Sequence, residues 1–234
     1  MERPTTPGEA RGVRGFTLIE LIVVVAIVAV LATLAYSNLW RQRPRAQLAG
    51  ASVEVEALLR NARQNALSTG RDTVLMIFPN EPNSAGGRGR IVVVEDRSPA
   101  GLTFFSAAAP QHFGGFAAGG SVNSDAMLGS YEFPRGITLG LGGAPVPALE
   151  EPYKTLLLTA SPDAVAVGAC SFCGADRGAV VFDARGRARF YQGDGDPLNV
   201  FGGTIALNGA PDVTGYRLIV ITAATGGVRG FNNG

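Results

Sequence analysis

Residues 14–36, RGFTLIELIVVVAIVAVLATLAY, decide the fold of the first part of the chain. From Phe16 to Ala35 the segment holds 20 residues, and Glu20 is its only charged residue. At about 1.5 Å per residue, a helix of this length spans about 30 Å, which is roughly the hydrocarbon thickness of a bilayer. The pattern therefore predicts a transmembrane helix over residues 16–36.

Glu20 is an expensive residue in such a helix, because a carboxylate near the end of a membrane span costs about 2–3 kcal/mol. The apolar run offers no cation to pair with it. A cut after Gly15 would supply one, since the new amine of Phe16 is positively charged. Two opposite charges about 4 Å apart attract by about 4 kcal/mol at an effective dielectric near 20, before desolvation is counted.

Three simpler interpretations explain less of this segment. A secretory signal has an apolar core of about 7–15 residues and is cleaved after that core, whereas here the run is longer and the Gly-Phe junction precedes it. A plain membrane anchor explains the length but not Glu20. A core helix of a soluble protein is seldom apolar on every face.

The string Gly15-Phe16-Thr17-Leu18-Ile19-Glu20, followed by the apolar run, resembles the start of type IV prepilins. These are the precursors of type IV pilins and of type II secretion pseudopilins. The resemblance implies that a membrane peptidase cuts between Gly15 and Phe16 and methylates the Phe16 amine. It also implies that Glu20 registers each subunit against its neighbour in a filament.

The same resemblance implies partners and a location. The partners would be other pilins or pseudopilins, bound through the N-terminal helix, the prepilin peptidase and methyltransferase, and inner-membrane lipid before assembly. The location would be the bacterial inner membrane, crossed once with a periplasmic head, and then the pilus or pseudopilus. No cofactor is implied.

A second helical pattern follows the apolar run. Leu48, Val55, Leu59, Ala62 and Ala66 recur at spacings of three, four and seven and so share one helix face, after an expected kink or interruption at Pro44. Gly70 is a plausible C-terminal cap. We therefore divide the chain into a cleaved leader (1–15), a transmembrane and filament-core helix (16–36), an amphipathic continuation (37–70) and a β-rich periplasmic domain (71–234).

Short apolar and β-branched runs between turn residues fill the rest of the chain and predict strands. These runs are Thr73–Phe78, Arg90–Glu95, Leu102–Ser106, Ile137–Leu141, Thr155–Thr159, Ala179–Asp183, Arg187–Tyr191 and Tyr216–Thr222. With 32 glycines and 14 prolines, the composition favours turn-rich β-structure. The predicted class is α+β: a pilin-like lollipop whose long N-terminal helix packs on an antiparallel head.

The segment Asp183-Ala-Arg-Gly186 predicts a hairpin turn between two of these strands. The order of a helix, Arg71-Asp72, a strand and a later D-x-R-G-R turn resembles the H-type pseudopilins and the FimT/FimU minor pilins.

Arg185, Arg187 and Arg189 are spaced by two, which places them on one face of an extended strand. Gly186-Arg187-Ala188-Arg189 is similar to the G-R-x-R pattern of FimT-like pilins linked to DNA uptake, and this implies DNA contact at the three arginines as an alternative. In those pilins the pattern lies near the chain end, whereas 45 residues follow it here. Without residues 1–15 the chain has 17 basic and 17 acidic residues, so bulk charge gives no reason to expect nucleic acid. A solvated hairpin face is the preferred interpretation.

Two segments depart from the strand rhythm. Residues 107–130, rich in Gly, Ala and Ser, predict a long surface loop, with subunit docking as the alternative. Residues 192–203 contain Asp194 and Asp196, but two carboxylates are too few for the six to eight oxygens that calcium prefers. A solvated turn is expected there, and no metal site.

Cys170 and Cys173 are separated by two residues. The pair admits a small-loop disulfide, two free thiols, or zinc or redox chemistry. An oxidising environment outside the membrane favours the disulfide, and the single histidine, His112, argues against a zinc site within one chain.

The chain contains no G-x-S-x-G, P-loop or H-E-x-x-H motif, so we expect no enzyme and no catalytic residues. The sequence predicts a minor pilin or pseudopilin subunit with a structural or initiating role. The alternatives are a FimT-like DNA-binding minor pilin and a membrane-anchored periplasmic protein without a filament role.

Overall fold

The structure is a computed structural model that describes residues 16–84, 86–97, 121–122, 125–141, 153, 169–174, 177–193, 196–209 and 215–233. The chain divides into two compact units, Met1–Gln42 and Arg43–Gly234. The second unit holds the latter part of the long helix together with every strand of the described chain.

Helix α1 runs from Leu18 to Thr69 and contains Pro44. Of the two outcomes predicted at Pro44, a kink or an interruption, the interruption is therefore wrong, and the kink stays a prediction. Proline removes one N–H donor from the hydrogen-bond ladder, and the neighbouring turns continue the helix on both sides of that single loss. The helix ends at Gly70, whose φ of 69° is in the left-handed region and whose N–H donates to the carbonyl of Ala66 at 3.0 Å.

The predicted apolar face of the second half of α1 is confirmed. Leu48, Val55, Leu59, Ala62 and Ala66 are each at most 4% exposed and belong to the largest hydrophobic cluster. These side chains bury one stripe of the helix, as a period of 3.6 residues requires. The latter part of α1 thus belongs structurally to the second unit, Arg43–Gly234, which we call the head.

The strands of the described chain form two antiparallel sheets. The first sheet has the order β3-β4-β2-β1-β6-β7-β8. Its strands are β1 (Thr73–Pro82), β2 (Arg88–Glu95), β3 (Ser121–Val122), β4 (Asp125–Glu132), β6 (Gly178–Phe182), β7 (Ala188–Tyr191) and β8 (Pro197–Leu198). The second sheet has the order β11-β10-β9-β5, with β5 (Ile137–Leu139), β9 (Gly202–Gly209), β10 (Tyr216–Thr222) and β11 (Val228–Asn233).

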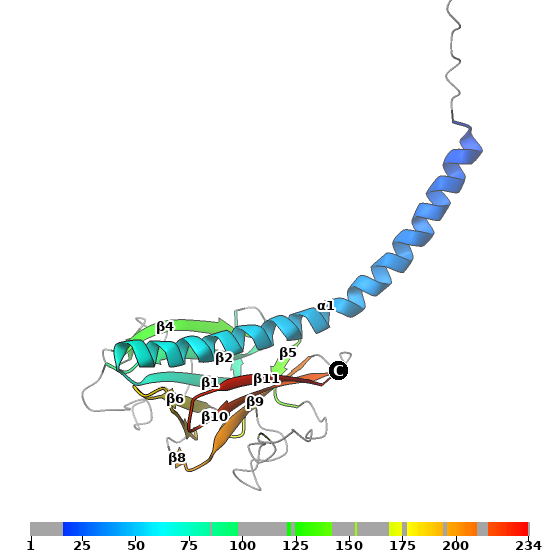
Figure 1. The fold of residues 1–234 in the computed structure, drawn as a ribbon. Helices are drawn as coiled ribbons and strands as arrows, with labels where there is room; N and C mark the ends of the chain where they lie inside the picture. Colours follow the sequence, from blue (N-terminus) through cyan, green and yellow to red (C-terminus); the bar gives the residue numbers. More distant parts are fainter. Residues whose placement is uncertain are drawn as a thin grey trace, which may run out of the picture. The chain divides into compact units, whose positions relative to one another are not determined.

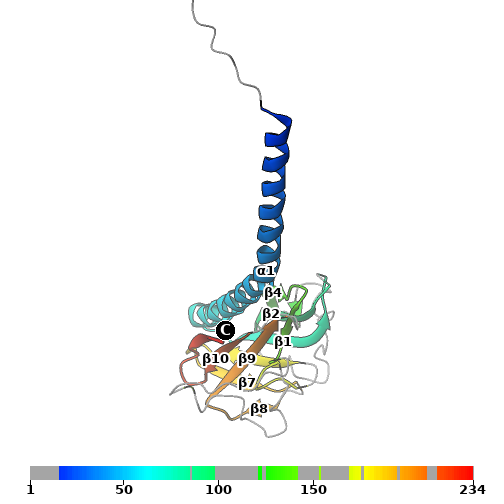
Figure 2. The same ribbon diagram turned by 90° about the vertical axis from the view of Figure 1, so that its right-hand side faces the viewer.

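The main core lies where the latter part of α1 meets both sheets (Figure 1). The helix contributes Leu59, the first sheet contributes Leu75 and Phe182, and the second contributes Ile205 and Ile219; each of them is fully buried. Figure 2 shows β9 of the second sheet near β7 of the first. The sheets approach each other where β2 meets β5 and where β7 meets β9. This arrangement confirms the predicted α+β class, one long N-terminal helix followed by antiparallel sheets.

Most predicted strands are present with shifted ends. β1 is longer than predicted and reaches Pro82, whereas β5 stops at Leu139. The hairpin turn at Asp183–Gly186 joins β6 to β7, with Gly186 at a φ of 74° and its N–H donating to the Asp183 carbonyl at 2.7 Å. The predicted strands Leu102–Ser106 and Thr155–Thr159 lie outside the described residues.

The predicted loop over residues 107–130 is wrong in its last part. Residues 121–122 and 125–130 belong to β3 and β4, which pair with each other, and β4 also pairs with β2. The ladder pairs Gly129 with Val93 and Met127 with Val94, so Leu128 is the extra residue of a β-bulge. In β4, small residues and the bulge interrupt the alternation of apolar and polar residues from which a strand is predicted. Residues 107–120, including His112, lie outside the described residues.

Two further strands, β9 and β11, were not predicted. Their sequences, GGTIALNG and VRGFNN, are rich in glycine or asparagine, which are depleted in strands. The predicted solvated turn over residues 192–203 is also wrong in part, because it contains β8 and the start of β9. Asp194 lies outside the described residues.

Candidate functional site

The first turn of α1 is organised around Thr17 and Glu20. The N–H of Thr17 donates to Glu20 Oε2 at 3.4 Å, and the N–H of Glu20 donates to Thr17 Oγ1 at 3.3 Å. Because the helix begins at Leu18, Thr17 is the N-cap and Glu20 the third helical residue, which makes this reciprocal pair a capping box. The carboxylate of Glu20 thus lies at the backbone N–H of Thr17, the residue that follows Phe16.

Thr17 was not among the residues predicted from the sequence. The signal for it was present, since a Thr followed three residues later by Glu, directly before an apolar run, is a sequence signature of a helix start. Glu20 therefore has a local role in the single chain. It satisfies an otherwise free helix N–H and places a negative charge where the helix dipole favours one.

The large apolar side chains from Phe16 to Leu34 are exposed. Phe16 is 81% exposed, and the other large apolar side chains of 18–34 are between 51% and 77% exposed. Apolar surface of this extent is unfavourable in water, and it marks a place where a protein partner or a membrane covers the chain. No helix among the described residues met the combined length and hydropathy expected of a membrane span. Gly15, the residue before the predicted cleavage point, lies outside the described residues.

Of the three arginines of the predicted stripe, Arg185 lies in the β6–β7 turn, Arg187 directly before β7 and Arg189 within it, so the three do not share one extended strand. The carboxylate of Asp183 accepts hydrogen bonds from the backbone N–H of Arg185 and of Arg187, each at 2.9 Å, and from Arg187 Nε at 2.8 Å. Arg189 forms an ion pair with Asp72. Burial raises the pKa of Asp183, but the hydrogen bonds from Arg187 and Arg185 outweigh it and hold that pKa below the ordinary value. Two of the three guanidinium groups are thus paired with carboxylates of the chain itself.

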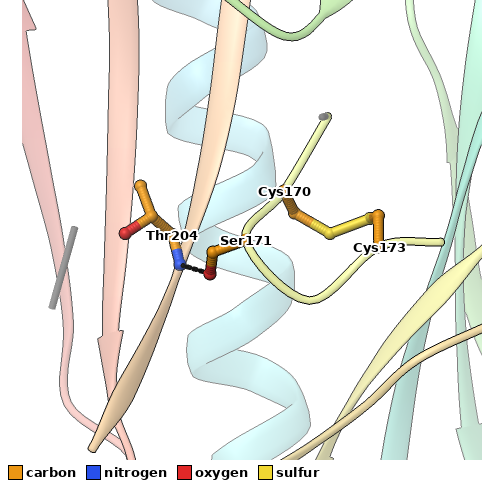
Figure 3. The surroundings of a disulfide bond; sticks show 4 residues. All are labelled: Cys170, Ser171, Cys173 and Thr204. Carbon is orange, nitrogen blue, oxygen red and sulfur yellow. Dashed lines mark hydrogen bonds between the residues drawn. A yellow bond between two sulfur atoms is a disulfide. The ribbon is translucent and has the colours of Figure 1, made fainter. Parts of the chain in front are cut away.

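Cys170 and Cys173 form a disulfide, with their Cα atoms 5.1 Å apart (Figure 3). Cys170 makes an isolated bridge to Ile205 of β9, and the hydroxyl of the intervening Ser171 accepts a hydrogen bond from the N–H of Thr204 at 2.9 Å. Residues 169–174 are thereby attached to the second sheet. No group of three or more metal-ligating side chains occurs in the described part of the chain.

Comparisons with known proteins bear on the N-terminal segment alone. No curated protein and no solved structure was found to match the chain. Residues 10–36 match the family model described as the prokaryotic N-terminal methylation motif. This match spans the Gly15-Phe16 junction, the Thr17–Glu20 capping box and the apolar run that follows. The chain therefore carries a prokaryotic N-terminal methylation motif, which supports a type IV prepilin-like protein.

Proposed function

We propose that the chain is a minor pilin or pseudopilin, a subunit that assembles into a type IV pilus or a type II secretion pseudopilus and catalyses no reaction. The observation that carries this proposal is the methylation motif at residues 10–36, together with the exposed apolar side chains that follow Phe16. Each of these side chains gains about 1.5–3 kcal/mol when it is buried. Lipid covers them before assembly, and the helices of neighbouring subunits cover them in the filament.

Glu20 gives this packing its register. A carboxylate surrounded by apolar side chains is costly unless it meets a cation, and the amine of Phe16 from an adjoining subunit is the cation that processing supplies. The Thr17 hydroxyl and N–H hold the carboxylate at the helix start until that amine arrives. We further propose an inner-membrane location with a periplasmic head, in the H-type pseudopilin and FimT/FimU group, on the strength of the Asp183–Arg187 turn.

The DNA-binding alternative has less support. A phosphate backbone is attracted by unpaired positive charge, and Asp183 and Asp72 already offset two of the three arginines of the stripe. The remaining alternative is an anchored protein without a filament role. It needs no pairing of Glu20 with a neighbouring subunit, whereas the main proposal depends on that pairing.

Intact-mass analysis of protein extracted from membranes tests the proposed processing. We expect residues 16–234 with one added methyl group, and an unprocessed chain when Gly15 is replaced by a bulky residue. An N-terminus near Ala35, or an uncut chain in cells that contain the peptidase, contradicts the assignment to prepilins.

Co-purification with filaments tests the assembly role. Glu20→Ala should be inserted and cleaved, because alanine removes the cost of a buried carboxylate, yet it should fail to enter filaments. Glu54→Ala, which alters an exposed carboxylate in the head, is the matched control and should assemble normally. Normal incorporation of Glu20→Ala would leave the anchored protein as the better explanation.

A further inference from the structure

The part of α1 that follows the apolar run is basic. Arg41, Arg43 and Arg45 occur within five residues of one another, and the sequence has no acidic residue between Glu20 and Glu54. All three arginines lie in α1, which is assigned as one helix from Leu18 to Thr69. The match to the methylation motif ends at residue 36, so the motif does not account for them.

The distance between these arginines and the apolar run relates them to a membrane surface. At about 1.5 Å per residue, residues 16–35 span about 30 Å, so Tyr36 marks the end of a hydrocarbon layer and Arg41 lies about 7–8 Å beyond it. The headgroups add about 5–7 Å to the hydrocarbon on each side of a bilayer. A helical side chain leaves its Cα toward the helix N-terminus, so the side chains of Arg43 and Arg45 extend back toward the apolar run. Lipid phosphates are therefore within reach of the basic segment.

Two aromatic residues mark the same boundary. Tyr36 and Trp40 are four residues apart and so share a face of α1, and the side chain of Tyr36 is 63% exposed. Tyrosine and tryptophan are enriched at membrane–water interfaces, where their rings lie at the level of the headgroups. An apolar run that ends in two such residues and then in cations is the pattern of an interfacial anchor.

The arrangement of the arginines around the helix separates a membrane from other anionic partners. Arg43 and Arg45 are both exposed, although two residues at this spacing are about 200° apart around a helix axis. A nucleic acid or an acidic protein surface approaches a helix from one side and would contact one of the two. Headgroups surround a spanning helix on every side, and the same lipids cover the exposed apolar side chains.

We propose that Arg41, Arg43 and Arg45 bind the phosphate groups of anionic phospholipids at the membrane surface that faces the head. This inference rests on the membrane location proposed above, and it adds the class of lipid and the residues that select it. A basic residue near an anionic membrane surface strengthens its binding by about fivefold. Lipids bound at this end of the span oppose movement of the helix along its axis, which is the movement by which a subunit leaves the membrane for a filament.

The fluorescence of Trp40, the single tryptophan of the chain, reports which lipids lie beside the arginines. The full-length chain is reconstituted in vesicles that contain equal amounts of phosphatidylcholine and phosphatidylglycerol. In each sample one of the two lipids carries bromine on its acyl chains near the headgroup, where bromine quenches a neighbouring tryptophan. Both leaflets have the same composition, so the result does not depend on the orientation of the chain.

We expect the quenching to give phosphatidylglycerol an association constant about fivefold above that of phosphatidylcholine. The preference should fall as the salt concentration rises, because salt screens charges at the membrane surface. Inorganic phosphate at constant ionic strength should leave the preference unchanged, since a free anion covers none of the apolar run. Loss of the preference in inorganic phosphate would instead assign the arginines to a soluble anion.

Two triple variants locate the interaction. The first replaces the basic segment, with Arg41→Gln, Arg43→Gln and Arg45→Gln, and should quench equally with the two lipids. The control removes the same charge from exposed positions on the head, with Arg88→Gln, Arg135→Gln and Arg185→Gln, and should keep the preference. Thermal unfolding verifies that the head remains folded in both.

The possible failures are distinguishable. Equal quenching by the two lipids in the wild type, or a preference that the first triple variant keeps, would overturn the proposal and leave the membrane location intact. Absence of quenching by either lipid would overturn the membrane location as well. Binding of an oligothymidylate to the chain in phosphatidylcholine vesicles, lost in the first triple variant, would assign the arginines to nucleic acid instead.

Discussion

Glu95 connects three parts of the head that are distant in sequence. It is 4% exposed, and its carboxylate accepts hydrogen bonds from Asn65 at 3.1 Å, Arg71 at 3.2 Å and Arg97 at 2.8 Å. Asn65 belongs to the last turns of α1, Arg71 to the turn into β1, and Arg97 follows the end of β2. One buried carboxylate therefore fixes how the helix leads into the first sheet.

The pKa of Glu95 makes the stability of the head depend on pH. The hydrogen bonds from Arg97 and Asn65 lower this pKa below its ordinary value of 4.5, burial opposes them, and Arg71 adds to the lowering. Because the folded pKa lies below the unfolded one, the stabilisation is complete above pH 4.5 and is lost as the pH falls through the folded pKa. We expect Glu95→Gln to reduce the free energy of unfolding by about 1–3 kcal/mol at neutral pH.

Thermal unfolding of the two proteins across a pH series measures this effect. The difference between wild type and Glu95→Gln should shrink below pH 4.5, as wild-type Glu95 takes up its proton. Glu54→Gln, at an exposed position on α1, should follow the wild type throughout. A gap that stays constant from neutral to acidic pH would contradict the assigned role of Glu95.

At the scale of elements, the sequence predicted a feature where the feature depends on residues close together in the chain. It did not predict a feature that depends on contacts with distant segments. The spacing of Leu48, Val55 and Leu59 was enough to predict the buried face of α1, since a helix face depends only on local periodicity. The capping box at Thr17 and Glu20 was equally local. Strand β9 was not predictable in this way, because its glycines make sense only beside side chains that lie far along the chain.

Gly203 of β9 is the clearest case of this dependence. A Cβ built on Gly203 would lie 2.7 Å from ring atoms of both Phe172 and Phe190, two buried side chains whose ring centroids are 5.1 Å apart. The strand needs glycine there because the aromatic pair already fills the space. In the sequence, Gly203 argues against a strand, because glycine is depleted in strands. In the structure, the packing of Phe172 and Phe190 requires a glycine at this position.

Replacement of Gly203 should therefore reduce the stability of the head more than replacement of another strand glycine does. We expect Gly203→Ala to lower the free energy of unfolding by about 1–3 kcal/mol, because the rings must shift to admit a methyl group. Gly129→Ala in β4 is the matched control, since nothing lies within 4 Å of its added Cβ. Chemical denaturation of both variants gives the comparison, and equal effects at the two sites would refute the packing argument.

At the scale of the whole head, residues 169–174 connect the two sheets. Cys170 bridges to Ile205 of the second sheet, while Gly178, at the start of β6 in the first sheet, is packed so closely against Cys173 that an added Cβ would lie 2.8 Å from its Cα. The Cys170–Cys173 disulfide closes the turn between these attachments. It therefore supports the junction of the sheets.

Reduction of this disulfide should destabilise the head modestly. For so short a loop, the chain-entropy model gives a loss of about 2 kcal/mol at 25 °C. The unfolding temperature should fall when a reductant is added, and the double variant Cys170→Ala, Cys173→Ala should not respond to the same treatment. An unfolding temperature that is insensitive to reductant in the wild type would mean that the backbone attachments alone hold the junction.

The sequence separation between α1 and the strands β10 and β11 sets a condition on when the head can fold. Ile219 and Ile221 of β10 lie in the same core cluster as Leu59 of α1, and a Cβ at Gly226 would meet the Gly186 carbonyl of the β6–β7 turn. During synthesis the helix thus emerges long before the strands that complete its hydrophobic contacts. Until β10 (Tyr216–Thr222) has appeared, the apolar stripe of the helix lacks part of its cover, and contacts of such large sequence separation form slowly. A chain that emerges from its N-terminus therefore completes this core only after both β10 and β11 have been made.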